Sequence, residues 1–307
     1  MFSKTIDFNK SFKPALIAYA AILAVSIILT AIFGVNLDIN FKGGTRISYS
    51  YTGELSADKI QSTVKGVTNA TVAVTQSTAL AGDTKTFTLS FAGRDSVDAE
   101  IQQKLTEAFE KDFADNEPTL YDSTSVSPSV ATAFFVKTMV AVLIAAILVV
   151  IYIGFRFRKI GGVSAAITAF VALILDVLIA FFTCTVFGLQ IDSNFMAVVL
   201  MILGYSLNDT IVIYDRVREN RRLYPDKTTD ELVNDSINSV MKRTLITTAT
   251  TIIAVFTIVV VSEIHGLTSL RSFAIPMATG LVSGSISSLF ISGPLWVIWK
   301  NKTAKKK

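Results

Sequence analysis

The chain has 307 residues, of which 51% are hydrophobic and only 17% are charged. Its mean hydropathy is +0.54, and a soluble protein of that composition would struggle to cover its own surface with polar groups. The apolar residues gather in long runs, which indicates an integral membrane protein. The net charge of +4 comes from basic residues beside those runs, so it does not indicate nucleic-acid binding.

Six apolar runs reach the length of about 20 residues that a membrane-spanning helix needs. They lie at 14–35, 134–155, 163–187, 193–214, 244–262 and 271–299. The first run follows a short tail, 1–13, and no small-residue cleavage site clearly comes after it, so we predict an anchor and not a removed signal peptide. The other five runs make up the region 134–299, and a basic tail, 300–307, follows them.

Residues 36–133 separate the first two spans and are typical of a domain of strands and helices. Alternation and turn residues predict strands at 45–51, 70–76, 85–92 and 120–127, helices at 56–66 and 94–113, and a turn at 79–83. We therefore expect an extracytoplasmic α+β domain of the order βαββαβ, which is typical of the ferredoxin-like fold. That fold alone indicates no function.

The segment 215–243, between the fourth and fifth spans, contains a helix-start pattern. Thr228 and Glu231 fit a capping box. The apolar face that follows is formed by Leu232, Val233, Ile237, Val240 and Met241. We expect a short amphipathic helix that either lies on the membrane surface or packs on a neighbouring loop.

Basic residues are divided unequally between the two sides of the membrane. Eighteen Lys and Arg residues lie in the segments 1–13, 156–162, 215–243 and 300–307. The short loops on the other side, 188–192 and 263–270, have none. Because Lys and Arg mark the cytoplasmic side, we expect both termini in the cytoplasm and the domain 36–133 outside it.

Two carboxylates lie well inside the spans, Asp176 and Asp209. A charge at the bilayer centre costs about 2.5–3.5 kcal/mol on insertion scales, whereas burial favours the neutral, protonated form of a carboxyl group. Such a group can take up and release a proton, as a proton-driven machine requires. At about 1.5 Å per residue, Asp176 lies ~20 Å from Val163, and Asp209 lies ~9 Å before Asp215, closer to the cytoplasmic edge.

Polar neighbours of Asp209 extend this hypothesis. Tyr205 and Asn208 share the adjoining helical turn and could relay hydrogen bonds, while Arg243 stands at the start of the fifth span on the same side. A nearby cation favours the charged form of a carboxyl group, so a pairing that forms and breaks would switch the proton affinity of Asp209. Asp209 and Asp176 could instead form structural hydrogen bonds, without a role in proton transfer. Arg243 could instead anchor its helix at the membrane surface.

Small or kink-tolerant residues recur at every fourth position of the sixth span. They are Pro276, Gly280, Gly284, Ser288 and Ser292. Such a stripe lets another helix approach closely, either inside the protein or from a partner subunit. Pro276 is also a candidate kink site.

Several chemistries are not expected. Cys184 is the only cysteine and His265 the only histidine, so the sequence predicts no disulfide, no metal cluster and no Ser-His-Asp triad. There is no GxxxxGK(S/T) pattern, so ATP is not the expected direct energy source. We predict no catalytic residues, no metal and no cofactor, with protons as the coupling ion.

The sequence GYSLNDTIVIYDRVREN at 204–220, followed by RTLITTATT at 243–251, resembles the SecF family, the smaller half of the SecD–SecF pair. Supporting stretches are LDINFKGGT at 37–45, LQIDSN at 189–194 and GLVSGSISSLFISGPL at 280–295. The layout of six spans, with one exterior domain between the first two, agrees as well. The resemblance covers nearly the whole chain.

This resemblance implies a subunit of the RND superfamily that uses proton flow to assist late export of unfolded polypeptide through the Sec channel. Its expected partners are a SecD-like chain in a pseudo-symmetric pair, a channel of the SecY, SecE and SecG type, the translocating polypeptide and membrane lipid, but no nucleic acid. The expected location is the cytoplasmic membrane of a prokaryote. In this family the acid at the Asp209 position and the arginine at the Arg243 position are tied to proton transit.

Two positions depart from the pattern of that family. Asn40 stands where the family often has Asp before the Phe of its GG motif, and Leu175 stands where many relatives have His before Asp176. The first departure puts in doubt any role that needs a charge at that position. The second weakens a proton role for Asp176.

The sequence is also compatible with two other functions. A passive scaffold would bind the Sec channel without converting energy. An intramembrane aspartyl protease would use Asp176 and Asp209 as a dyad. Such a dyad needs both acids at one depth, sharing a proton, and the estimated depths differ by roughly 10 Å.

Overall fold

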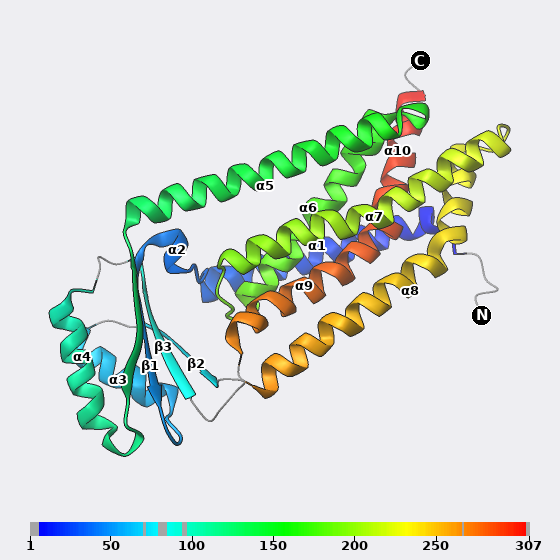
Figure 1. The fold of residues 1–307 in the computed structure, drawn as a ribbon. Helices are drawn as coiled ribbons and strands as arrows, with labels where there is room; N and C mark the ends of the chain where they lie inside the picture. Colours follow the sequence, from blue (N-terminus) through cyan, green and yellow to red (C-terminus); the bar gives the residue numbers. More distant parts are fainter. Residues whose placement is uncertain (1–5, 70–71, 79–84, 94–96, 266, 305–307) are drawn as a thin grey trace.

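Six helices in the described part of the chain are long and apolar enough to cross a membrane (Figure 1). The computed structural model describes residues 6–69, 72–78, 85–93, 97–265 and 267–304. The spans are α1 (Phe8–Phe33), α5 (Pro128–Arg156), α6 (Gly162–Val186), α7 (Ser193–Leu223), α8 (Thr229–Ile264) and a last span, Leu270–Thr303. Each of them overlaps one of the predicted apolar runs.

The helices on either side of the predicted loop 215–243 are longer than the hydropathy pattern indicates. α7 continues to Leu223, and α8 begins at Thr229. A residue that precedes a proline is disfavoured in a helix, so Pro225 explains why α7 stops where it does. The connection between the two helices shrinks to residues 224–228.

α8 is one continuous helix, so the prediction of a separate surface helix is wrong. The predicted capping box forms at its start, where the Glu231 side chain accepts from the Thr228 amide and the Thr228 hydroxyl accepts from the Glu231 amide. No glycine or proline interrupts the sequence from 229 to 264, so nothing stops the helix before the span. Its apolar face packs inside the bundle instead of on the membrane surface, burying Leu232, Val233, Ile237 and Met241, with Val240 partly buried.

The last span is irregular. It consists of α9 (Thr268–Ser287) and α10 (Gly293–Ala304), joined by a π-helical turn at Ser288–Ser292. α9 runs through the candidate kink site Pro276 without ending, and the change in helical hydrogen bonding comes about three turns later. π-helical turns inside longer helices are frequent at functional sites, which directs attention to this part of the bundle.

An α/β domain lies between α1 and α5, at one end of the bundle (Figure 1). Its elements are β1 (Gly44–Tyr51), α3 (Ala57–Thr68), β2 (Ala73–Thr78), β3 (Lys85–Ala92), α4 (Ala99–Asp112) and β4 (Thr119–Val126). The strand order is β2-β3-β1-β4, and all neighbouring strands are antiparallel. These strands and helices overlap the predicted ones, while the predicted turn 79–83 lies outside the described residues.

The two faces of this sheet differ in chemistry. One face is covered by α3 and α4 and buries the apolar side chains of Ile47, Tyr49, Phe87 and Leu89. The other face carries polar side chains, among them Arg46, Ser48, Thr88 and Ser90, along a cleft of about 530 Å³. The opposite wall of the cleft is the α6–α7 loop, with Gln190 and Asp192. Strand alternation therefore separates a hydrophobic core from a polar surface that faces the bundle.

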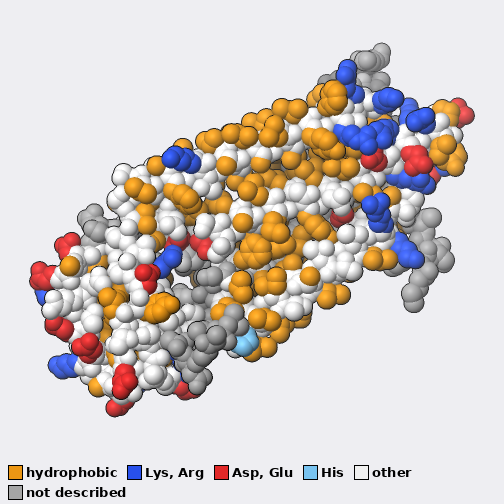
Figure 2. Space-filling view, viewed as in Figure 1, with side chains coloured by type: hydrophobic (Ala, Val, Ile, Leu, Met, Phe, Trp, Pro, Cys, Tyr) orange, Lys and Arg blue, Asp and Glu red, His pale blue; other side chains and the backbone are white. Residues whose placement is uncertain are grey.

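The surface of the bundle carries apolar side chains between two polar ends (Figure 2). Lys and Arg side chains gather at the end where both termini lie, and acidic side chains are spread over the α/β domain at the other end (Figures 1 and 2). α1 and α5 are the most exposed spans, with large apolar side chains such as Ile17, Ile32, Leu143 and Ile151 on the outside. Helices that are apolar all round are expected to contact lipid.

Candidate functional site

Asp176 lies on α6 at the junction of three helices, and its side chain is fully buried. Ser206 of α7 donates a hydrogen bond to Asp176 Oδ2 at 2.7 Å. From α9, Ser283 donates to Oδ1 at 2.7 Å and Ser287 donates to Oδ2 at 2.9 Å. Both carboxyl oxygens of Asp176 are therefore occupied by hydroxyl donors, which offset the cost of burying a polar group.

Two glycines of α9 let the helices approach closely enough for these hydrogen bonds. A Cβ atom on Gly284 would lie 2.9 Å from Ser206 Cβ and 3.5 Å from Asp176 Oδ2. A Cβ atom on Gly280 would overlap the Ile202 side chain of α7. The small-residue stripe of the sixth span thus lies against α7 inside the chain, where close approach of helices requires it.

Ser288 begins the π-helical turn and contacts α7 as well. Its hydroxyl lies 3.0 Å from Thr210 Oγ1 and donates to the Ser206 carbonyl at 3.3 Å. About one turn further on, the Ser292 hydroxyl lies 3.0 Å from the Tyr214 hydroxyl. Hydroxyl groups of the last span and of α7 therefore contact each other in a row that starts near Asp176.

Asp209 lies on α7 in different surroundings. The residue is 3% exposed, yet no described residue forms a hydrogen bond with its Oδ2 atom. Thr244 and Thr248 of α8 are also buried, and their hydroxyls likewise lack a partner among the described residues. Thr248 lies near enough to the Asp209 carboxyl group for its hydroxyl to serve as a donor, and the positive charge of Arg243 acts on the same group, which places Asp209 at the α7–α8 interface. Unpaired buried polar atoms cost about 1–3 kcal/mol each, so such a cluster is a candidate functional site.

Arg243 stands on α8 with its side chain exposed. None of the ion pairs among the described residues includes it, so the predicted pairing with Asp209 is not formed in this arrangement of the helices. The Tyr205 hydroxyl donates to the Thr247 carbonyl at 3.0 Å and lies 2.7 Å from Thr251 Oγ1, which ties α7 to α8 one turn from Asp209.

Asn208 is exposed on the outer side of α7, next to Asp209 in the sequence. Within the described part of the chain, neither Asn208 nor Tyr205 forms a hydrogen bond with Asp209. The predicted relay of hydrogen bonds through these two side chains is therefore not assembled here. Tyr205 instead holds the helix pair together, and Asn208 presents an amide to the surroundings of the bundle.

The two acids lie closer in depth than the sequence-based estimate of roughly 10 Å. Asp176 contacts Ser206, which precedes Asp209 by three residues on α7, about 4.5 Å along the helix axis. The acids nevertheless face different helices, and among the described contacts no hydrogen bond joins them. A protease dyad requires two carboxyl groups that share one proton, so this geometry does not form one.

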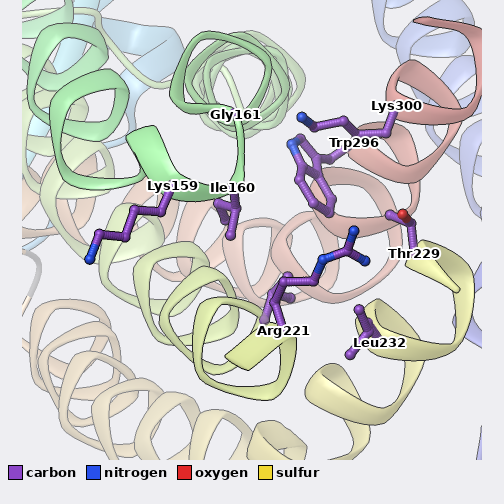
Figure 3. A pocket seen from close by; sticks show the side chains of 9 residues that line it. Lys159, Ile160, Gly161, Arg221, Thr229, Leu232, Trp296 and Lys300 are labelled. Atoms are coloured by element: carbon purple, nitrogen blue, oxygen red, sulfur yellow. The ribbon is translucent and has the colours of Figure 1, made fainter. Parts of the chain in front are cut away.

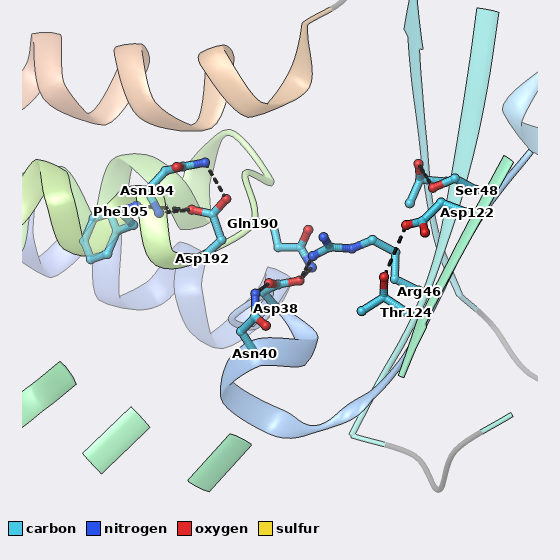
Figure 4. Close-up of polar contacts among 11 residues, drawn as sticks. Asp38, Asn40, Arg46, Ser48, Asp122, Thr124, Gln190, Asp192, Asn194 and Phe195 are labelled. Carbon is cyan, nitrogen blue, oxygen red and sulfur yellow. Dashed lines mark hydrogen bonds and ion pairs between the residues drawn. The ribbon is translucent and has the colours of Figure 1, made fainter. Parts of the chain in front are cut away.

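A second polar centre, which the sequence reasoning missed, joins the α/β domain to the bundle (Figure 4). Asp38, in the connection between α1 and β1, is fully buried and pairs with Arg46 of β1. Its carboxylate also accepts from Asn40 at 2.7 Å and from Gln190 of the α6–α7 loop at 3.2 Å. The Asp38 amide donates to the Ile191 carbonyl at 3.1 Å. The sheet is therefore connected to residues that directly precede α7.

The departure from the family pattern at Asn40 has a physical role at this centre. Its side-chain amide donates to Asp38, whereas an aspartate there would put a second carboxylate against a buried one. Nearby, Asp192 caps α7 by accepting from the amides of Asn194 and Phe195 at 2.9 and 3.1 Å. Burial raises the pKa of Asp192 above its ordinary value, and the negative charge of Asp38 adds to the shift.

Proteins of known sequence that are similar to this chain are subunits of protein translocases. Residues 105–302 match the family model described as protein export membrane protein SecD/SecF, C-terminal. The chain is 32% identical over 296 residues to the protein translocase subunit SecF of Alicyclobacillus acidocaldarius, covering 93% of this chain and 90% of that one. It is also 32% identical over 305 residues to the protein translocase subunit SecDF of Bacillus subtilis, covering 98% of this chain but 39% of that longer one.

Two solved structures resemble the chain over almost all of its length. SecDF, a translocon-associated membrane protein from Thermus thermophilus, gives a TM-score of 0.81 at 26% identity, covering 97% of this chain and 39% of that one. A structure of SecDF in a super-membrane-facing form gives a TM-score of 0.66 at 25% identity, covering 100% of this chain and 40% of that one. The chain thus spans about two fifths of the SecDF proteins that it matches.

Proposed function

The chain belongs to the SecD/SecF family of protein export membrane proteins, and on that premise we propose that it is the SecF-type half of a proton-driven export unit. In this proposal the proton motive force supplies energy for late translocation and release of polypeptides across the cell membrane. Asp209 is the group that takes up and releases the proton. The observation that carries the proposal is the buried, unpaired Oδ2 atom of Asp209 between two membrane-spanning helices.

A carboxyl oxygen without a hydrogen-bond partner, such as Asp209 Oδ2, can take up a proton without breaking a hydrogen bond. The hydroxyl of Thr248, which lacks a partner among the described residues, can donate to a charged Asp209 or hold a water molecule beside it. A similar change at Asp176 would disturb donors on two helices. Proton transit through the α7–α8 interface therefore requires less reorganisation than transit through the α6–α9 interface.

In this proposal Arg243 controls how tightly Asp209 binds its proton. Its positive charge acts on the Asp209 carboxyl group, although none of the ion pairs among the described residues joins these two side chains. A shift of α8 along α7 that brought the guanidinium group against Asp209 would stabilise the charged carboxylate, and the reverse shift would favour the protonated form. The proton affinity of Asp209 would then follow the relative position of the two helices.

A SecD-type partner is expected to cover the outer face of α7 and α8. Asn208 of α7 and Arg243 of α8 are both exposed in the described structure, and an arginine at the centre of a span costs about 2.5–3.5 kcal/mol against lipid. Gly204 lies one turn from Asn208, and a Cβ atom there would meet nothing within 4 Å, so the surface is open. The length of SecDF of Bacillus subtilis, of which this chain covers 39%, supports a partner half that fills this surface.

The charge distribution supports termini in the cytoplasm, because basic side chains gather at the end of the bundle where both termini lie (Figure 2). The α/β domain would then lie outside the cytoplasm, where polypeptides leave a channel of the SecY, SecE and SecG type. We assign this domain to the ferredoxin-like class, supported by its strand order β2-β3-β1-β4. The Asp38–Arg46 junction would transmit movements of α7 to the domain.

Export of a secreted reporter protein tests the proposal in cells that depend on this chain. The comparison uses the wild type, Asp209→Asn and Asp209→Glu, each with and without an uncoupler. We expect the wild type to speed export only while the proton gradient is intact, and Asp209→Asn to behave like the absence of the chain. Asp209→Glu should retain part of the activity because it can still carry a proton.

Glu219→Gln is the matched control, because it removes a negative charge from the exposed end of α7 and should leave export unchanged. Normal export by Asp209→Asn, inserted at the wild-type level, would refute the proton role. A wild-type contribution that survives the uncoupler would instead identify the chain as a passive scaffold on the Sec channel.

A further inference from the structure

A small pocket opens at the end of the bundle where both termini lie (Figure 3). Its volume is about 180 Å³. Its walls come from the α5–α6 connection, the ends of α7 and α10 and the first turn of α8. Four segments that are distant in the sequence therefore meet around one space.

Two cations give this pocket a positive charge. In Figure 3 the Arg221 guanidinium group lies between Trp296 and Thr229, and the Lys300 amine lies on the other side of Trp296. The Lys300 amine is 5.6 Å from the centre of the Trp296 ring. Lys159 also lines the pocket, with its amine directed away from the other two cations (Figure 3). The lining contains no acidic side chain.

Neither Arg221 nor Lys300 forms an ion pair with a described residue. Both side chains line the same small pocket, so their positive charges add there. An anion in the pocket would be attracted by both cations. Thr229, the first residue of the 36-residue helix α8, lines the same space.

The base of the pocket is apolar. Ile160, Val217, Leu232 and Trp296 are all buried there. Trp296 and the exposed Trp299 of α10 lie near the end of the last span, where tryptophan is enriched at the boundary between lipid and water. The pocket therefore combines cations at its rim with an apolar floor at the depth of lipid headgroups.

We propose that this pocket binds the phosphate group of an anionic phospholipid from the leaflet on the side of the termini. The cations would hold the phosphate, and the apolar floor would contact the glycerol and the first methylene groups. The volume of about 180 Å³ is below the ~300–1,000 Å³ of pockets for larger organic ligands, which favours a single phosphate group over a nucleotide. Basic pockets between spans bind lipid headgroups in other membrane proteins.

A bound phosphate would bridge the ends of the helices that carry the proton site. Arg221 lies on α7, which also carries Asp209, and Thr229 begins α8, which also carries Arg243. Lys300 belongs to α10. The lipid would therefore fix one end of the α7–α8 pair, while the other end stays joined to the α/β domain.

Lipid retention by the purified full chain tests this inference. Native mass spectrometry in neutral detergent would compare phosphatidylglycerol, phosphatidylcholine and inorganic phosphate as probes. The variant Arg221→Gln/Lys300→Gln removes both pocket cations, and Arg222→Gln/Lys302→Gln makes the same charge change on the same two helices outside the pocket. We expect preferential binding of phosphatidylglycerol, reduced roughly 30-fold by the first variant and less than about twofold by the second.

Three outcomes would overturn the inference. Equal losses in the two double variants would show general attraction to the basic end of the molecule. Equal retention of phosphatidylglycerol and phosphatidylcholine would show no anion site, and inorganic phosphate that displaces phosphatidylglycerol at similar concentration would show a site for the soluble ion. If the double variant fails to fold by circular dichroism, the single variant Arg221→Gln, which alters an exposed side chain, should show about a fivefold loss.

Discussion

Asp176 and Asp209 are two buried acids about one helical turn apart in depth, and their surroundings are opposite. Asp176 accepts hydrogen bonds from serines on two helices, and glycines of α9 permit the close packing that brings them there. Asp209 has an unpaired oxygen, and the neighbouring Thr248 hydroxyl lacks a partner among the described residues. An acid whose oxygens all accept hydrogen bonds stabilises one arrangement of the helices. An acid with an oxygen that lacks a hydrogen bond is compatible with more than one arrangement.

The comparison also assigns different roles to two helix interfaces of the same bundle. The α6–α7–α9 contacts around Asp176 are buried and are formed by small and hydroxyl-bearing residues, which suits a rigid core. The α7–α8 contacts around Asp209 leave polar atoms unpaired and place Arg243 within electrostatic reach. We expect the first interface to determine stability and the second to determine activity.

The largest expected effect is on transport by Asp209→Asn. The contribution of the chain to the export rate should fall by more than tenfold, because the asparagine amide cannot take up a proton near neutral pH. Stability should change by about 1 kcal/mol or less, because Asp209 Oδ2 has no described hydrogen bond to lose. The thermal unfolding midpoint in detergent, measured beside the export rate, checks both parts. A large drop in the midpoint would show that Asp209 is structural.

The reverse result is expected for Asp176→Asn. The amide nitrogen replaces an oxygen that accepts from serine hydroxyls, so the free energy of unfolding should fall by roughly 2 kcal/mol. Export per folded molecule should stay within about twofold of the wild type. Unfolding midpoints and export normalised to folded protein check this expectation, and a stable but inactive Asp176→Asn would erase the distinction between the two acids.

An effect on stability alone is expected from Gly284→Ala, which tests the packing around Asp176. The added Cβ atom would lie 2.9 Å from Ser206 Cβ, so the helices must separate, at a cost of about 1–3 kcal/mol. Gly204→Ala is the control, since its Cβ atom would meet nothing within 4 Å. Chemical or thermal unfolding of both variants measures the difference, and equal stability of the two would contradict tight packing at Gly284.

The smallest effect concerns Asp192, a third acid that is both buried and hydrogen-bonded. Its folded-state pKa is raised above 3.8, so the folded protein binds this proton more tightly than the unfolded chain does. This raised pKa lowers stability progressively as pH rises above 3.8 through the raised value. Asp192→Asn, which keeps a good helix cap, should therefore gain up to about 1 kcal/mol over the wild type at neutral pH and nothing at acid pH.

Unfolding of the wild type and Asp192→Asn from acid to neutral pH measures that difference. A gain that is the same at every pH would show that the effect comes from the cap alone. A gain that grows as the pH falls would contradict the direction of the shift.

The spans and the elements of the α/β domain could be predicted because local patterns determine them. Apolar runs of sufficient length indicated the helices, and alternation at 45–51 and 85–92 indicated β1 and β3. The capping box at Thr228 and Glu231 correctly indicated where a helix begins. The continuation of α7 to Leu223 was missed, because hydropathy measures the end of the apolar run and not the end of the helix.

The surroundings of the two acids could be predicted only in part. The motif around Asp209 singled out the residue, but its unpaired state depends on how α8 packs. The donors to Asp176 lie 30, 107 and 111 positions away in the sequence, so no local pattern connects them. One signal was present, since Ser283 and Ser287 recur one turn apart beside the glycine stripe. The two sides of the junction at Asp38 lie in the stretches 37–45 and 189–194, which the resemblance singled out, but no local pattern connects these stretches.

The most direct test of the proton role is proton flux through the chain together with its SecD-type partner in liposomes. A pH-sensitive dye inside the vesicles would record proton entry under an imposed pH difference and membrane potential. The account predicts flux with the wild type and with Asp176→Asn, and background flux with Asp209→Asn. Flux that persists in Asp209→Asn and disappears in Asp176→Asn would contradict it, because the satisfied acid would then be the one that carries the proton.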